Sequence, residues 1–373
     1  MGDVDLAVPP ARLRRTPPSG NRLHRQSGSR SRSSTGRKPL ALEEKRSGST
    51  SSVSKLDLQA IADNTWREDA ALTATSSRSD NEGATVLRIG MIGTENSHIT
   101  HFTKLLNVEE RHTGVRATAL VGGHSERNLE LAELGGIGLI VDEPKDLLGQ
   151  VDAAIISTRD GARHLADARP LIETGMPVLV DKPLAASTAD AEELIRIAQS
   201  NSALLLSCSA LRFVPEMEYF PPTHETGDLR HLHVIGPADP DSEYSGLFFY
   251  GIHHVEAALE ILGDPIVEPE ALDVVGSRHR DLVTAAFPLG DAHVTLSFIT
   301  PTETSRVPFH ATAVFERAVV SHDLTLGADY NAPALAEFIG MIESGRNTRT
   351  PEQLRSPVQI LAALVTQIER NSR

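Results

Sequence analysis

The sequence is short of cysteine and of long apolar runs. Among its 373 residues, Cys208 is the single cysteine. This excludes a disulfide scaffold, a Cys-rich zinc site and a CxxC redox pair, and it is compatible with a reducing compartment. No run approaches the ~18 apolar residues that a membrane-spanning helix needs. We therefore expect a soluble, cytoplasmic protein with no membrane partner.

Positive charge is also scarce, except near the N-terminus. Residues 1–85 hold 14 Lys and Arg against 10 Asp and Glu, a net charge of +4, whereas residues 86–373 hold 22 against 40, a net charge of −18. The average field of so acidic a body repels a phosphate backbone, which argues against nucleic acid as a partner. A small-molecule substrate is the better expectation.

The N-terminal stretch 1–85 has no sustained apolar period and is rich in Ser, Arg and Pro, as in 28–39, GSRSRSSTGRKP. A segment of this composition does not bury enough apolar surface to offset its ordering entropy, so we predict a disordered leader. A short helix fits at residues 55–69. The twin arginines Arg14 and Arg15 are not followed by the apolar region of a signal peptide.

From residue 86 onward, short apolar runs alternate with amphipathic helical segments. The runs cover 86–93, 115–123, 138–142, 151–158, 176–183 and 203–210. Such alternation is typical of βαβ units around a parallel sheet that is buried on both faces. We therefore predict an α/β protein whose residues 86–210 form a doubly wound Rossmann domain that binds a dinucleotide.

Beyond residue 210 the pattern changes to alternating strands with one interrupting helix, at 254–262. The expected strands are 229–236, 271–277, 282–288, 292–300 and 307–315. They predict an α+β domain over 211–330 with a mostly antiparallel sheet and one polar face. Residues 331–373 contain two helices, 334–345 and 351–371, expected to pack back on the body. His231 and His233 share a strand face, but no third ligand is evident, so we expect no metal.

The turn after the first strand is where a Rossmann domain holds phosphate. The fingerprint GxGxxG is reduced here to Gly93, and its second glycine is replaced by Glu95, whose charge would repel a pyrophosphate. Thr94, Asn96 and Ser97 could still donate hydrogen bonds to phosphate. The alternative interpretation is that Gly93 only makes a strand-to-helix turn.

The end of the second strand bears on the choice between NAD and NADP. NAD-binding strands end with an Asp or Glu near the ribose 2′-hydroxyl. Here the strand ends in Gly122 and Gly123, with Ser125 and Arg127 nearby. A 2′-phosphate is the easier partner for these residues, so NADP is preferred over NAD. The alternative is that Ser125 only caps a helix and Arg127 is solvated.

Asp181-Lys182-Pro183 directly follows the fifth apolar run, where a lysine faces the ligand crevice. Here the sequence resembles the Gfo/Idh/MocA oxidoreductase family, whose hallmark at this place is Glu-Lys-Pro. Similar stretches occur in the family's order over residues 86–373. They are IGMIG (89–93), VDAAIIST (151–158), LRFVPE (211–216), YGIHHVEAALEILG (250–263) and the closing segment 337–372.

The resemblance implies roles for several residues. Lys182 would lie beside the nicotinamide and orient or deprotonate the substrate hydroxyl, and Thr158 and Asp181 would line the same side of the crevice. His253 matches the family's catalytic histidine, but the aspartate four residues earlier is Phe249 here. The nearby replacements are Tyr250, His254 and Glu256. On a helix starting near His253, Glu256 would lie one turn on and hold a ring N–H.

Two further side chains have open interpretations at this stage. Arg212, just past the sixth strand, either contacts a substrate oxygen or the cofactor, or pairs with an acid at the domain junction. His253 and His254 either belong to the site or simply begin a helix that packs under the sheet.

Together these features predict an NAD(P)-dependent oxidoreductase that transfers a hydride between the nicotinamide and a hydroxyl carbon of a sugar, polyol or related molecule. One alternative is a non-catalytic ligand-binding or regulatory protein on a degenerate dehydrogenase fold, to which Glu95 and Phe249 both point. The other is an NAD-dependent glycoside hydrolase. The resemblance also implies a homo-oligomer, a dimer or tetramer.

Overall fold

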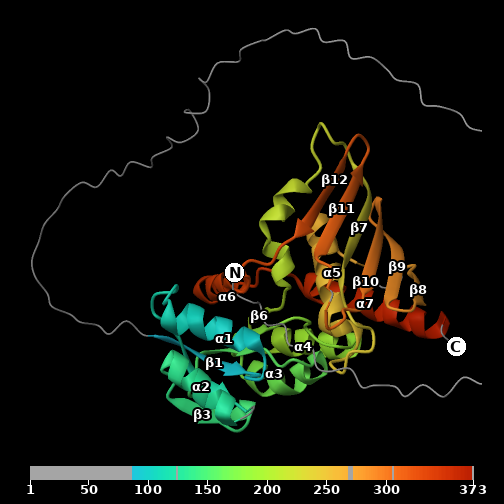
Figure 1. Cartoon of the computed structure of the whole chain (residues 1–373). Helices are drawn as coiled ribbons and strands as arrows, with labels where there is room; N and C mark the ends of the chain where they lie inside the picture. Colours follow the sequence, from blue (N-terminus) through green and yellow to red (C-terminus); the bar gives the residue numbers. More distant parts are fainter. Residues whose placement is uncertain (1–85, 123–124, 268–271, 305, 372–373) are drawn as a thin grey trace, which may run out of the picture. The chain divides into compact units, whose positions relative to one another are not determined.

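The structure is a computed structural model that describes residues 86–122, 125–267, 272–304 and 306–371 (Figure 1). The leader expected over 1–85, and the helix considered within it, lie outside the described residues. Among the described helices, none is long and apolar enough to cross a membrane.

The first part of the described chain is a parallel sheet, sheet A, in the strand order β3-β2-β1-β4-β5-β6. Its strands are β1 Leu87–Ile92, β2 Val115–Val121, β3 Leu139–Val141, β4 Ala153–Ile156, β5 Val178–Val180 and β6 Leu205–Leu206. This is the order of a Rossmann fold, in which the strand order reverses beside β1 and leaves a crevice at the carboxyl ends of the strands. The predicted doubly wound sheet is therefore confirmed.

Helices cover both faces of sheet A because successive strand residues point to opposite sides. Ile89 and Met91 of β1 join a core with α1 and with α6 from the C-terminal part, whereas Ile92 joins the core formed with α3 and α4. The helices are α1 Ser97–Thr103, continued by a π-helical turn Lys104–Val108, α2 Ser125–Gly135, α3 His164–Ile172, α4 Thr188–Ser200 and α6 Ala332–Ser344.

The second part is a mixed sheet, sheet B, in the order β12-β11-β7-β10-β9-β8, in which only the described pair β7 and β10 is parallel. Its strands are β7 Leu229–Pro237, β8 Val275–His279, β9 Leu282–Leu289, β10 Ala292–Ile299, β11 Phe309–Phe315 and β12 Val319–Leu324. β12 was not foreseen, because its exposed edge residues carry no apolar alternation.

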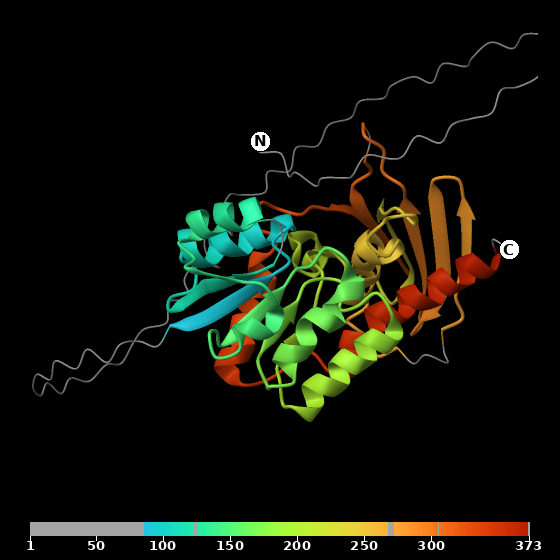
Figure 2. The same ribbon diagram turned by 90° about the horizontal axis from the view of Figure 1, so that it is seen from below.

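Two helices connect the sheets. α5 Leu247–Ile261 packs on β7 and β10, and α7 Pro351–Asn371 contacts α4, α5 and β8, running from sheet A toward sheet B (Figure 2). α5 begins at Leu247, not near His254 as expected. Gly246 precedes it with φ +59°, a left-handed conformation that favours glycine. As a result His253 lies inside the helix and not at its first turn.

Candidate active site

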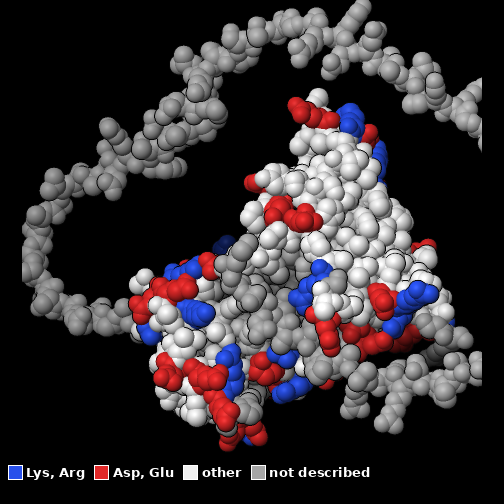
Figure 3. Space-filling model, viewed as in Figure 1, with Lys and Arg blue, Asp and Glu red and all other residues white. Residues whose placement is uncertain are grey.

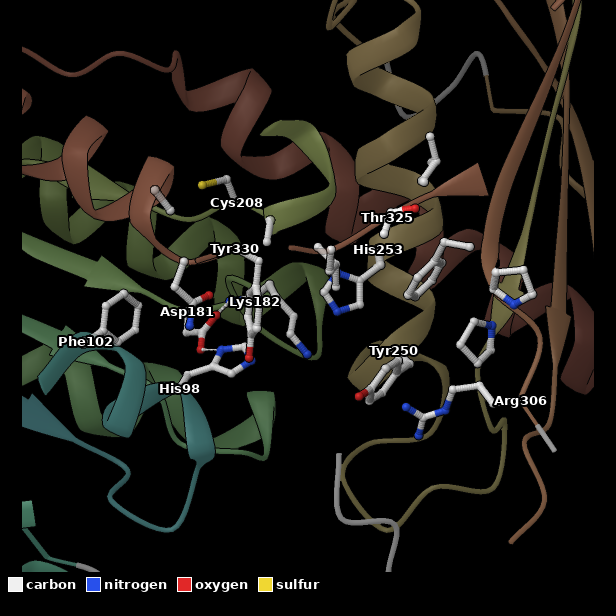
Figure 4. A pocket seen from close by; sticks show the side chains of 18 of the residues that line it. His98, Phe102, Asp181, Lys182, Cys208, Tyr250, His253, Arg306, Thr325 and Tyr330 are labelled. Carbon is white, nitrogen blue, oxygen red and sulfur yellow. Dashed lines mark hydrogen bonds and ion pairs between the residues drawn. The ribbon is translucent and has the colours of Figure 1, made fainter. Parts of the chain in front are cut away.

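A cavity of about 240 Å³ lies between the carboxyl end of β5, helix α5 and the segments that flank β11 and β12 (Figure 4). Its polar lining consists of His98, Asp181, Lys182, Tyr250, His253, Arg306, Thr325, Tyr330 and Asn331. The structure thus brings together Lys182, His253, Tyr250 and Asp181, which the sequence had singled out. His98, Arg306 and Tyr330 were not anticipated.

Lys182 leaves the end of β5 and points toward α5 (Figure 4). Its Nζ donates a hydrogen bond to the Phe249 carbonyl (3.0 Å) and lies 4.9 Å from the centroid of the Phe249 ring. Burial lowers the pKa of Lys182 to about 8, although the charge of Asp181 acts in the opposite direction. A lysine with this pKa exchanges its proton near neutral pH, as general acid–base catalysis requires.

Asp181 anchors this corner of the cavity. Its Oδ2 accepts hydrogen bonds from His98 Nδ1 and Ser157 Oγ, both at 2.6 Å, and its Oδ1 accepts from the backbone N–H of Lys182 (2.8 Å). Burial by itself raises the pKa of Asp181, but the neighbouring positive charges and hydrogen bonds outweigh it and hold that pKa well below its usual range. Asp181 is therefore a fixed negative charge beside Lys182.

His98 occupies the position where GxGxxG would have its third glycine. The ring is also flanked by Tyr330, edge-on at 5.4 Å between centroids, and by His101, stacked at 6.4 Å. The third glycine normally allows close packing of helix and strand. The histidine at this position is the sequence feature that could have indicated a contact between the loop after β1 and the turn that carries Asp181 and Lys182.

His253 is buried, and its Nδ1 lies 2.6 Å from Ser209 Oγ. Burial first, and then the charge of Lys182, hold the pKa of His253 well below its usual range, so the imidazole is neutral at neutral pH. Ser209 also accepts the N–H of Leu211 as the cap of a 3₁₀ turn, which fixes its hydroxyl. Ser209 thus takes the orienting position for which the sequence had suggested a carboxylate.

The structure corrects the expected role of Glu256. Its carboxylate pairs with Arg212, which also binds Glu260 (3.0 Å) and Asp264 (3.1 Å). The Arg212 side chain is 1% exposed, and a guanidinium removed from water requires such carboxylates. Neither Glu256 nor Arg212 lines the cavity. Glu256 therefore does not orient His253, and Arg212 follows the second of its two interpretations, an ion pair at the junction.

His254 is also displaced from the expected site. Its ring is fully buried against Phe298 and Phe309, at centroid distances of 4.5 and 5.3 Å, and burial lowers its pKa to about 4. It does not line the cavity. The successive histidines therefore differ in role, because adjacent positions on a helix point in different directions.

A second cavity, of about 480 Å³, lies at the carboxyl ends of β1, β2 and β4, where a Rossmann fold holds a dinucleotide. Of the predicted cofactor residues, Gly93 and Thr158 line it. Gly93 has φ +86°, and a Cβ there would collide with the backbone of Ser157 and Thr158. The Thr158 hydroxyl donates to Asp167 (2.6 Å). A glycine is thus needed at position 93 for the backbone turn between β1 and α1, and this turn lines the second cavity.

The other predicted phosphate ligands, Thr94, Asn96 and Ser97, lie in the loop after β1 or at the start of α1. Thr94 Oγ1 donates to the Gly122 carbonyl (3.1 Å). Asn96 caps α1, accepts the N–H of His98 and donates to the Ser157 carbonyl (2.9 Å). Ser97 is the first residue of α1. None of the three side chains lines the second cavity.

Glu95 is hydrogen-bonded to Arg159. The Glu95 carboxylate accepts the backbone N–H of Arg159 (3.1 Å), and the Arg159 guanidinium donates to the Glu95 carbonyl (2.9 Å) and to Tyr244 Oη (3.3 Å). Arg159 and Arg163 both line the second cavity. A pyrophosphate in this cavity would meet these two cations, of which Arg163 also pairs with Asp167 (3.5 Å).

Arg127 is engaged elsewhere. Its guanidinium donates to the Thr94 carbonyl (3.3 Å), to Thr100 and to Glu130 (3.0 Å), and it does not line the second cavity. Asp142, after β3, does line it, next to Gly122. The argument for a 2′-phosphate based on Arg127 therefore loses its support.

Comparison with known proteins agrees with this architecture. Residues 87–208 match a family model described as the GFO_IDH_MocA oxidoreductase family with an NAD-binding Rossmann fold. Inositol 2-dehydrogenase 1 of Saccharopolyspora erythraea is 31% identical over 112 residues, which are 29% of this chain and 32% of that protein. The chain thus spans about a third of the length of this curated relative.

Solved structures are similar over most of the described chain. GenD2 from gentamicin A biosynthesis, in complex with NAD, has a TM-score of 0.66 at 17% identity and covers 81% of this chain and 97% of its own. A myo-inositol dehydrogenase from Corynebacterium glutamicum has a TM-score of 0.63 at 16% identity, covering 77% and 97%. At these identities the likeness concerns the fold. Residues 87–208, the Rossmann part of the chain, are thus similar to the Gfo/Idh/MocA family of oxidoreductases, and the solved structures share the chain's fold.

Proposed function

We propose that the chain is an NAD-dependent oxidoreductase that oxidises a hydroxyl carbon of a sugar or polyol, or reduces the corresponding carbonyl. The observation that carries the proposal is that Lys182, with its pKa of about 8, and neutral His253 line one cavity. The inositol 2-dehydrogenase and myo-inositol dehydrogenase among the similar proteins support a polyhydroxylated substrate.

The residues of the second cavity fit a dinucleotide. Its place at the ends of β1, β2 and β4, the tight turn at Gly93, and the cations Arg159 and Arg163 suit a pyrophosphate. Asp142 suits a ribose hydroxyl and disfavours a 2′-phosphate, so we propose NAD in place of the NADP that the sequence favoured. When bound, NAD supplies the acceptor for the hydride of the substrate carbinol.

The chain's own groups manage the proton. The Lys182 amine accepts the hydroxyl proton during oxidation and returns it during reduction, and Asp181 holds the backbone at this turn. With Nδ1 of His253 held by Ser209, its Nε2 is the nitrogen left for the substrate hydroxyl. The apolar part of the lining, including Phe309 and Leu324, excludes water from this pair.

Titration of the purified full-length chain with NAD, NADH, NADP and NADPH, followed by nicotinamide fluorescence and calorimetry, tests the proposal. We expect NADH to bind more tightly than NADPH, and Asp142→Asn to narrow that difference while Asp291→Asn, on the exposed β9–β10 turn, leaves it unchanged. Absence of binding by all four at millimolar concentration would overturn the proposal.

A second candidate, a sugar-binding protein without dehydrogenase activity, is favoured by the acidic lining of the second cavity. Its carboxylates are Glu95, Asp142, Asp160, Asp167 and Glu243. This candidate predicts sugar binding without nucleotide binding. The hydrolase alternative predicts cleaved glycoside without net NADH, which product analysis detects. The homo-oligomer stays a prediction, which sedimentation of the full chain tests.

A further inference from the structure

The cavity that holds Lys182 and His253 contains a second cation. Arg306, in the segment before β11, lines it together with Lys182. The carboxylate in the lining, Asp181, is already engaged by His98 and Ser157. Although residues 86–373 carry a net charge of −18, this cavity therefore offers positive charge to a ligand. Figure 3 shows that red and blue groups gather over the Rossmann part, whereas most of the surface over sheet B is white.

Arg306 is an exposed side chain that lines the cavity. Within the ranges that the structure describes, it forms no ion pair, and its guanidinium faces the Tyr250 ring at 5.8 Å (Figure 4). Burial raises the pKa of Tyr250, and the nearby Arg306 guanidinium acts to lower it. A guanidinium and a phenol side by side form a donor pair suited to an anionic group.

The separation of the two cations limits the size of the ligand between them. Lys182 Nζ lies 5.1 Å, and Arg306 Cζ 5.8 Å, from the centroid of the same Tyr250 ring, so the two are at most about 11 Å apart. A monosaccharide is therefore long enough to reach both cations at once. The cavity volume of about 240 Å³ is also below the ~300–1,000 Å³ of pockets for larger ligands.

We propose that the substrate is an anionic monosaccharide, with its carboxylate or phosphate held by Arg306 beside Tyr250 and its reacting hydroxyl at Lys182 and His253. This inference rests on the proposed oxidoreductase function and names its substrate class. Arg306 is then the residue that determines specificity for charge, while Lys182 serves the chemistry. A neutral polyol would fit the cavity but make no charge-assisted hydrogen bond to Arg306.

Calorimetric titration of the full-length chain in the presence of saturating NADH tests the inference with D-glucuronate, D-glucose 6-phosphate and neutral D-glucose. We expect at least one of the anions to bind roughly tenfold more tightly than glucose, as a charge-assisted hydrogen bond provides. The two anions distinguish a carboxylate from a phosphate. Equal affinities for all three sugars would overturn the inference.

Variants show whether the preference comes from Arg306. Arg306→Gln should remove the preference, so that the three sugars bind with similar affinity, and Arg306→Lys should keep part of it. Arg346→Gln, at an exposed position after α6, should leave the preference as it is. Loss of affinity for all three sugars alike in Arg306→Gln would contradict the assignment. If NADH binds but charged and neutral sugars bind with equal affinity, only this inference is refuted. If the anionic sugars bind but no nucleotide does, only the proposed oxidoreductase function is refuted.

Discussion

At the residue scale, we expect turnover to depend most directly on the Lys182 amine. Lys182→Ala should lower the rate constant by roughly 10²–10⁴-fold, the usual contribution of a general acid–base group, because no other described lysine lines the cavity. NADH affinity should change little, since Lys182 does not line the second cavity. Stopped-flow kinetics and nicotinamide fluorescence measure the two quantities, with exposed Lys104→Ala as control. Near-wild-type turnover in Lys182→Ala would assign the proton transfer to another group.

The same amine predicts a pH dependence. Oxidation needs neutral Lys182, whose fraction increases as pH rises through about 8, so the oxidation rate should rise there and the reduction rate should fall. Asp181 raises the pKa of Lys182 through its charge. Asp181→Asn should therefore shift the pH at which the oxidation rate rises to a lower value. Rate profiles between pH 6 and 10 in both directions check this sign; a shift to higher pH would contradict it.

At the scale of elements, α5 separates chemistry from stability within one helix. Glu256→Gln takes one of three carboxylates from the buried Arg212 and should cost about 1.5–3 kcal/mol of unfolding free energy. Ser209→Ala removes the partner of His253 and a turn cap and should cost only about 1 kcal/mol, yet lower turnover more than Glu256→Gln does.

Urea denaturation and steady-state rates on both variants test this separation. If Glu256→Gln loses more turnover than Ser209→Ala at a temperature where both remain folded, the acid acts on His253 after all. Ser209→Thr keeps the hydroxyl and should keep most of the activity, which distinguishes the hydrogen bond to His253 from packing.

The sequence predicted sheet A well because its strands are apolar on both faces, and it predicted Lys182 because the lysine ends one of them. It misplaced the start of α5, since residues 247–250 are apolar and aromatic and carry no helical period. Glu256, Glu260 and Asp264 form a visible stripe, but only the tertiary structure shows that Arg212 is its partner. Ser209 and Arg306 come from distant segments with no local motif.

At the scale of the whole molecule, the charge of −18 over residues 86–373 opposes any anionic ligand through the average field. Raising ionic strength from about 0.01 to about 0.15 M shortens the Debye length to about 8 Å and screens that field more than the contacts of Arg159 and Arg163. NADH affinity should therefore improve with salt, whereas that of uncharged adenosine should not. Fluorescence and calorimetric titrations over this range measure both; weaker NADH binding at higher salt would mean that the local arginines dominate.

α5 also has a consequence for how this protein can diverge. His253, Glu256 and Glu260 are spaced so that rotating the helix to re-aim the imidazole would pull both carboxylates away from Arg212. Natural variation toward new substrates should therefore leave 253, 256 and 260 in register. It should accumulate at the cavity-lining residues 306–309, 324–326 and 330–331, which do not contact Arg212. Among related proteins, we therefore expect the sequence of α5 to vary less than the cavity-lining residues around β11 and β12.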